Sequence, residues 1–175
     1  MKRFFLNYLV IALAAPALFT TCSKDDGNKR GGGTITMTSP EISGNLDIGI
    51  AGTGEITIDW GDGTEKETFS LSSFDGFFYW GGYNIVEKYS YKHFYGGVAR
   101  TITITGENIT ALDVGKYSNL WLTSLDVSGC KTLTYLDCAT GLLISLDVSK
   151  NTALTQLYCA YNTLTSLDVS IKRFS

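Results

Sequence analysis

Aspartate recurs in this sequence at a spacing that suits cation binding. Asp126, Asp147 and Asp168 lie 21 residues apart, and each is followed two positions later by a serine. A column of carboxylates offers oxygen ligands to a hard cation. Aspartates in turns also accept hydrogen bonds from nearby backbone amides. Because repetition alone produces such a column, turn formation is the favoured interpretation and a cation ladder is the alternative.

Cysteine shares the same interval. Cys138 and Cys159 are 21 residues apart and take a position that apolar residues usually fill. Small buried thiols behave as hydrophobes, so we expect both in the core, with a disulfide between them as the alternative. Cys130 aligns with Asn151 and has no evident partner. No metal site and no cofactor is expected from these residues.

The elements that must position these residues are short repeated strands. Leucines open five similar segments, at positions 122, 133, 143, 154 and 164, in steps of 11, 10, 11 and 10 residues. The full period is therefore 21 residues, and a period of about 20–29 residues marks a repeat architecture. Apolar residues at the fourth and sixth positions of each segment, as at Leu157 and Cys159, alternate with period two. This alternation predicts short strands with one buried face.

The segment Leu154–Leu164 reads LTQLYCAYNTL and resembles the leucine-rich repeat, whose pattern here is LxxLxCxxNxL. The matching unit from Leu133 departs from the family, because Gly141 stands where the family has asparagine. The resemblance implies a solenoid with 21-residue coils and a ligand on the exposed strand face. By alternation, that face carries Tyr135, Asp137 and Ala139, then Gln156, Tyr158 and Ala160, with Tyr161 at the strand edge.

Residues 34–106 read as strands separated by glycine and aspartate turns. The strings ITIDWGDGT, YKHFYGG and RTITIT resemble the polycystic-kidney-disease (PKD) domain, an immunoglobulin-like sandwich. Asp59 and Asp62 invite a calcium hypothesis, but a tight turn needs aspartate and glycine here, and the turn is favoured. The positions that match the family are Trp60, Gly61, Asp62, Gly63, His93 and Tyr95, with His93 as a structural strand residue.

An insertion between these motifs is dense in aromatic residues, which make up ten of the twenty-two residues from Phe74 to Tyr95. Exposed rings of this kind stack on sugars or anchor protein contacts. The alternative is that they cover an edge of the sandwich or the end of the solenoid. The loop supplies the candidate ligand residues Tyr79, Trp80 and Tyr83, with Tyr135 and Tyr158 of the strand face as the second choice. The predicted ligand is a carbohydrate or a protein.

The N-terminus reads as a leader. A charged start at Lys2 and Arg3 precedes an apolar run, which predicts a secretory signal peptide at 1–21. The string LFTTC, ending at Cys22, resembles a bacterial lipoprotein box and implies a lipid anchor in the membrane, with an uncleaved or ordinarily cleaved leader as the alternative. Residues 23–33, SKDDGNKRGGG, read as a flexible tether and resemble the surface-export signal of Bacteroidetes lipoproteins. The resemblance implies the outer membrane, at the cell surface.

Charge and motifs limit the function. The net charge is −3 with no basic stripe, so no nucleic-acid partner is expected. The chain contains no GxSxG, HExxH, cysteine–histidine pair or phosphate loop. Carboxylates about 5–9 Å apart can hydrolyse glycosidic bonds, but Asp137 is the only acid on the predicted strand face. The predicted function is non-enzymatic binding or adhesion, with an accessory glycan-processing protein or hydrolase, or a structural spacer, as alternatives.

These patterns predict an all-β chain, in which an immunoglobulin/PKD-like β-sandwich precedes a short leucine-rich-repeat solenoid with 21-residue coils. The predicted divisions are the signal peptide at 1–21, the lipidated cysteine and tether at 22–33, the sandwich at 34–106 and the repeats at 107–175. Residues 108–114 already read as a repeat half-unit. The sandwich is therefore expected to cap the solenoid.

Overall fold

The structure, a computed structural model, describes residues 10–12, 33–40, 43–75, 79–80, 84–85, 89–97, 99–115 and 121–168. Within these ranges the chain consists of β-strands, turns and irregular segments, and none of the described residues lies in an α-helix. The all-β prediction is confirmed. The strands are β1 (Val10–Ala12), β2 (Gly33–Ser39), β3 (Ser43–Asp59), β4 (Glu67–Ser70), β5 (Tyr79–Trp80), β6 (Asn84–Ile85), β7 (Ser90–Gly96), β8 (Arg100–Asp113), β9 (Ser124–Asp126), β10 (Tyr135–Asp137), β11 (Ser145–Asp147), β12 (Gln156–Tyr158) and β13 (Ser166–Asp168).

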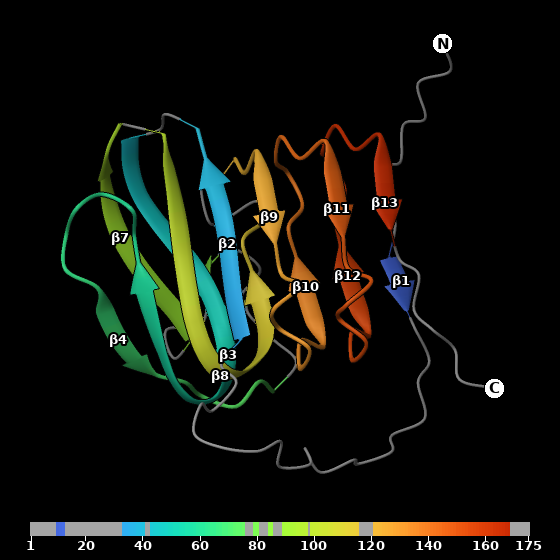
Figure 1. Cartoon of the computed structure of the whole chain (residues 1–175), viewed down its shortest axis with the longest axis horizontal. Helices are drawn as coiled ribbons and strands as arrows, with labels where there is room; N and C mark the ends of the chain where they lie inside the picture. Colours follow the sequence, from blue (N-terminus) through green and yellow to red (C-terminus); the bar gives the residue numbers. More distant parts are fainter. Residues whose placement is uncertain are drawn as a thin grey trace.

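The N-terminal part of the fold is an antiparallel sheet. β2 pairs with β8, β8 pairs with β3, and β3 pairs with both β4 and β7 (Figure 1). Side chains alternate across each strand, so Ile35 and Met37 of β2 are buried while Thr34 is exposed. Ile102 and Ile104 repeat this pattern in β8. The β-branched residues of these strands suit a half-buried pleated surface.

Two long strands, β3 and β8, join this sheet to the repeated part of the chain. They stay paired along most of their length, with register shifts on both sides of Gly52 and Thr53. Glycine is required at the bend, because a Cβ at Gly52 would lie 2.0 Å from the carbonyl oxygen of Asn108. β8 continues to Asp113 and therefore crosses the boundary predicted at residue 106.

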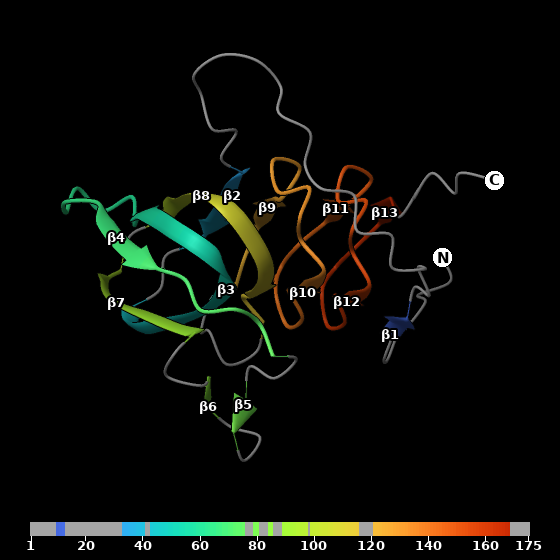
Figure 2. The same ribbon diagram turned by 90° about the horizontal axis from the view of Figure 1, so that it is seen from below.

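The repeated part contains three-residue strands in two columns, named here column A and column B. Column A consists of the end of β8 (Ala111–Asp113), β10 and β12, which pair in parallel with Leu112, Leu136 and Leu157 in register. Column B consists of β9, β11 and β13 (Figure 1); β11 and β13 are parallel, and β9 pairs antiparallel with β2. Figure 2 shows the two columns on opposite sides of the repeated part.

The outer edge of column A is paired with a segment of the predicted signal peptide. β1 runs antiparallel to β12, with Ile11 opposite Leu157. This pairing belongs to the uncleaved chain, so removal of residues 1–21 would leave this edge of β12 uncovered. The signal peptide itself remains a prediction.

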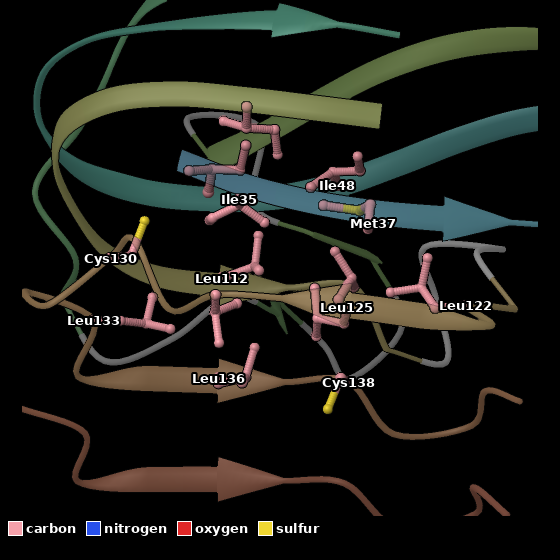
Figure 3. Packing of buried hydrophobic residues seen from close by; sticks show 14 of the residues in the cluster. Ile35, Met37, Ile48, Leu112, Leu122, Leu125, Cys130, Leu133, Leu136 and Cys138 are labelled. Atoms are coloured by element: carbon pink, nitrogen blue, oxygen red, sulfur yellow. The ribbon is translucent and has the colours of Figure 1, made fainter. Parts of the chain in front are cut away.

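A continuous hydrophobic core connects the antiparallel sheet with both columns. Ile35 and Met37 of β2 lie in the same cluster as Leu112 and Leu136 of column A, and each of the four has no exposed surface (Figure 3). Leu146 of column B belongs to the same cluster and is 2% exposed. The two columns are therefore held together by one core.

An asparagine links successive periods of the repeat. Asn162 Nδ2 donates hydrogen bonds to the carbonyl oxygens of Cys138 (2.8 Å) and Cys159 (3.1 Å), and its Oδ1 accepts one from the Leu143 N–H (3.0 Å). Gly141 occupies the equivalent position one period earlier, where a Cβ would lie 2.7 Å from Asn162 Oδ1. The glycine that departs from the repeat pattern thus leaves room for the asparagine of the next period.

Candidate ligand-binding face

The outward side chains of column A form one surface, named here the tyrosine face. The inward leucines of the column are buried, and the residues on either side of each leucine point away from the core. Alternation in the sequence predicts this division correctly. The tyrosine face comprises Tyr135 and Asp137 of β10 and Gln156 and Tyr158 of β12, whereas Ala111 and Asp113, their register neighbours on β8, are fully buried.

Aromatic rings cross this face in a row. The ring centroid of Tyr135 lies 5.5 Å from that of Tyr158 and 5.2 Å from that of Phe74, and Phe74 and Tyr135 both pack against a small buried cluster of Ala51, Tyr89 and Ala111. Phe74 is supported by Tyr89 at 6.0 Å. The Tyr89 hydroxyl donates to the Ser73 carbonyl oxygen (2.9 Å) and accepts from the Asp75 N–H (3.1 Å), so the segment that carries Phe74 is held on both sides of the ring.

The aromatic insertion and the strand face are therefore in contact. Sequence reasoning treats them as alternative ligand surfaces, yet Phe74, the first aromatic residue of the insertion, packs against Tyr135. Figure 2 shows the β5–β6 hairpin of the insertion on the same side of the molecule as column A. Tyr79 pairs with Ile85 in this hairpin. The side chains of Tyr79 and Trp80, and the whole of Tyr83, lie outside the part of the chain that the structure describes.

A shallow hollow of about 300 Å³ lies beside Phe74, where the antiparallel sheet meets column A. Its wall is mostly apolar and includes the Phe74 ring, with hydroxyl groups from Thr53, Ser73, Thr110 and Thr134 among the lining residues. The Thr110 and Thr134 hydroxyls donate to the carbonyl oxygens of Ala51 (3.3 Å) and Thr110 (2.8 Å), which leaves their oxygens able to accept. The lining residues are Gly52, Thr53, Ser73, Phe74, Thr110 and Thr134.

Asp137 lies on the tyrosine face, two residues after Tyr135 on β10. It is half-buried, and in the strand register it stands beside Tyr158 on one side and Asp113 on the other. Its Oδ1 accepts a hydrogen bond from the Ala139 N–H (2.9 Å). Burial raises the pKa of the Asp137 carboxyl, and the hydrogen bond from Ala139 opposes this effect. Burial also raises the pKa of Tyr135, and the neighbouring carboxylates add to the increase.

Asp113 is a buried acid in register with Asp137 that the sequence does not single out as a site residue. It has no exposed surface, and its Oδ1 accepts a hydrogen bond from the Gly115 N–H (3.0 Å). The signal was present, since Leu112-Asp113-Val114 repeats the LDV motif of the later segments. The irregular step of 13 residues from Ile109 to Leu122 hides the alignment with Asp137.

Two further candidates occupy the rim of the face. Gln156 is exposed, and Tyr161 is 56% exposed with a left-handed backbone at φ 56°. Tyr161 lies in the turn after β12, and its carbonyl oxygen accepts a hydrogen bond from the Gly141 N–H (3.1 Å). Both residues flank Tyr158, so five of the eight candidate ligand residues gather at column A.

The outward side of column B differs from the tyrosine face. Asp126 and Asp147 are exposed, and their Oδ1 atoms accept hydrogen bonds from the N–H groups of Ser128 (2.9 Å) and Ser149 (2.8 Å). The turn interpretation of these aspartates is therefore confirmed. Trp121, which precedes β9 in the chain, is 57% exposed.

The aspartates in and before the WGDG turn, Asp59 and Asp62, also stabilise local structure through hydrogen bonds and ion pairs. Asp62 Oδ2 lies 2.6 Å from His93 Nε2 and 3.2 Å from Arg100 Nη1, and His93 stacks on Trp60 with centroids 4.7 Å apart. Asp59 accepts the Gly61 N–H (3.0 Å). Within the described ranges, no three acidic, histidine or cysteine side chains form a group that would hold a metal ion. The turn is thus anchored to β7 and β8.

The three described cysteines are buried free thiols. Cys138 and Cys159 belong to the hydrophobic core, which confirms the core interpretation. Burial raises the pKa of both thiols. Neither thiol therefore has the low pKa of a reactive cysteine.

Comparison of the chain with protein-family models, with characterised proteins and with solved structures gives no significant match. Among the described residues, no helix has the length and apolar character needed to cross a membrane.

Proposed function

We propose that this protein is a non-enzymatic carbohydrate-binding module whose ligand site lies where a PKD-like sandwich passes into a leucine-rich-repeat solenoid. The observation that carries the proposal is the row Phe74, Tyr135 and Tyr158, which leads from the hydroxyl-lined hollow across column A. Aromatic faces stack on the apolar faces of sugar rings, and hydroxyl groups exchange hydrogen bonds with sugar hydroxyls.

The size of the site favours a sugar over a folded protein. Column A has three strands about 4.8 Å apart, so the tyrosine face is narrow. A stable protein interface buries about 800 Å² on each partner. A hollow of about 300 Å³ lies at the small end of the range of ligand pockets and suits a short saccharide.

Glycoside hydrolysis is less well supported. A hydrolase of this kind needs two carboxyl groups that both reach the glycosidic bond. Asp113 and Asp137 are register neighbours, but Asp113 has no exposed surface and accepts the Gly115 N–H. One accessible carboxyl group is compatible with binding and insufficient for this reaction.

The same proposal includes the location of the protein. Cleavage before Cys22 and lipidation of its thiol would anchor the chain in the outer membrane, and residues 23–33 would tether the sandwich at the cell surface. Radiolabelled palmitate should enter the wild-type protein and fail to enter Cys22→Ala. Equal labelling of the two forms would end the lipoprotein part of the proposal and leave the binding part intact.

A glycan array tests the binding activity. The wild-type chain should bind at least one class of glycan, and Tyr158→Ala should reduce the signal about tenfold or more, as expected for a lost stacking contact and its buried area. Trp121→Ala, which removes an exposed ring that is not part of the tyrosine face, is the matched control and should bind normally. Trp80→Ala reports whether the β5–β6 hairpin contributes. Loss of binding in Trp121→Ala alone would mean that the ligand site lies outside the tyrosine face.

A further inference from the structure

The carboxylate of Asp137 has an unused acceptor. Its Oδ1 receives the Ala139 N–H, and no described residue donates a hydrogen bond to Oδ2 or places a cation within ion-pairing distance of it. The aspartates of column B are exposed to water, which solvates their charge, whereas Asp137 is half-buried, with Tyr158 beside it on the neighbouring strand. Desolvation of this carboxylate is a cost that a bound cation would offset.

The surroundings of Asp137 favour a positive ligand. Among the described residues, the ionisable groups around it are Asp113, Tyr135, Tyr158, Cys138 and Cys159, and each of these side chains is either neutral or negatively charged. The rings of Tyr135 and Tyr158 also present negative π-faces, which attract cations. Charge complementarity therefore points to a cationic group seated beside these rings.

The geometry also limits the type of cation. A guanidinium group binds a carboxylate best through two parallel N–H bonds, which require both oxygens. Asp137 Oδ1 already accepts the Ala139 N–H, so a guanidinium would have to share that oxygen, whereas a compact ammonium group needs only one contact with Oδ2.

We propose that the sugar bound at the tyrosine face carries a free amine, as in glucosamine units, and that its ammonium group pairs with Asp137 Oδ2 while the ring stacks on Tyr158. This inference rests on the proposed carbohydrate binding and names its substrate class. N-Acetylation of the amine removes the charge and therefore the contact with Asp137. The ligand is thus a de-N-acetylated amino-sugar oligomer.

Isothermal titration of the full chain with two tetrasaccharides tests the inference. One is glucosamine tetramer with free amines, and the other is its fully N-acetylated counterpart, both at pH 6. The free-amine tetramer should bind about tenfold tighter, the size expected for one charge-assisted hydrogen bond. Asp137→Asn should reduce this preference to about twofold or less, because the amide keeps the acceptor for Ala139 and loses the charge. Asp147→Asn, at the equivalent position of column B, should keep the full preference.

Each outcome decides a different point. Equal binding of the two tetramers by the wild-type chain, or tighter binding of the acetylated one, overturns the amine inference and leaves carbohydrate binding standing. Preference that persists in Asp137→Asn overturns the role of Asp137. Failure of the wild-type chain to bind either tetramer or any glycan on the array would end the proposed function itself. The comparison of ligands on the wild-type chain holds even if a variant fails to fold.

Discussion

Columns A and B are built from the same repeated half-unit but present different surfaces. In both, a leucine points into the core and an aspartate accepts the N–H group two residues ahead, as at Asp137 and Asp147. In column A the aspartate, Asp137, lies between Asp113 and Tyr158 in the strand register, and burial raises its pKa. In column B it lies in water, and hydrogen bonds from the Ser149 hydroxyl and backbone N–H lower the pKa of Asp147. The same sequence motif therefore carries an aspartate with a raised pKa in column A and one with a lowered pKa in column B, because different residues pack beside it.

This difference indicates which aspartate would contribute more binding free energy in contact with a cationic ligand. A carboxylate in water gains little from pairing with a cation, because water already solvates it. A partly desolvated carboxylate gains more from the same contact. The segment that carries Phe74 covers the sheet end of column A and no such segment packs on Asp126 or Asp147 among the described residues. The packing of this insertion thus gives the aspartates of the two columns different degrees of solvation.

The largest expected effect concerns what the columns share. Leu136→Ala and Leu146→Ala each remove a buried leucine of the common core, one from column A and one from column B. Each should lower the free energy of unfolding by about 2–5 kcal/mol, measured by urea denaturation at pH 7. A loss of less than about 1 kcal/mol for Leu146→Ala alone would mean that column B folds apart from the core.

The second comparison uses the asparagines that follow each column. Asn162 after column A uses both its donor and its acceptor groups, whereas Asn151 after column B donates to the Val127 and Cys130 carbonyl oxygens and has a buried Oδ1 with no partner. Asn162→Ala should destabilise by about 1–3 kcal/mol. Asn151→Ala should cost less, because it also removes an unsatisfied buried oxygen. Equal losses of unfolding free energy for the two variants, measured by urea denaturation, would contradict this expected difference between Asn162 and Asn151.

The smallest effects concern pH. The pKa of Asp137 is raised above its ordinary value of 3.8 in the fold, so its neutral form is favoured, and its contribution to stability is lost as pH rises through the folded-state pKa. Asp137→Asn should therefore raise Tm at pH 7, and the gain should vanish below about pH 4. Asp147 has a lowered pKa, so its contribution is present at neutral pH and is lost as pH falls through the folded-state pKa.

Thermal unfolding of the two variants from pH 3 to pH 8 provides the measurement. Asp147→Asn should leave Tm at pH 7 unchanged or slightly lower, in contrast to Asp137→Asn. A variant that gains stability while it loses amine preference marks a residue retained for function. A drop in Tm for Asp137→Asn at pH 7 would assign Asp137 a structural role.

Local sequence patterns predicted the features of this fold that depend on neighbouring residues in the chain, such as strand faces and turns. Alternation placed Leu136 inward and Tyr135 outward, since a strand has only two faces. The turn aspartates and the buried thiols followed from residue type and position. Trp60 and His93 were identified as a strand and turn motif, and the structure stacks them.

The candidate site was predicted less completely because its contacts are long-range. Phe74 and Tyr135 lie 61 positions apart, and no periodicity relates an inserted loop to a repeat. The hollow depends on the bend of β3 and β8 at Gly52, where two backbones approach closely. Asp113 was missed because the junction between the two parts breaks the 21-residue period.

The most direct test of the central claim is an NMR titration of the full chain with the glycan that binds best on the array. Ring signals of Tyr135 and Tyr158, assigned through their phenylalanine variants, should shift together and saturate with the same affinity. Backbone signals of Ser145 and Asp147 in column B should stay in place. Saturable shifts confined to column B, or binding that leaves both tyrosine rings unperturbed, would contradict the assignment of the tyrosine face as the ligand site.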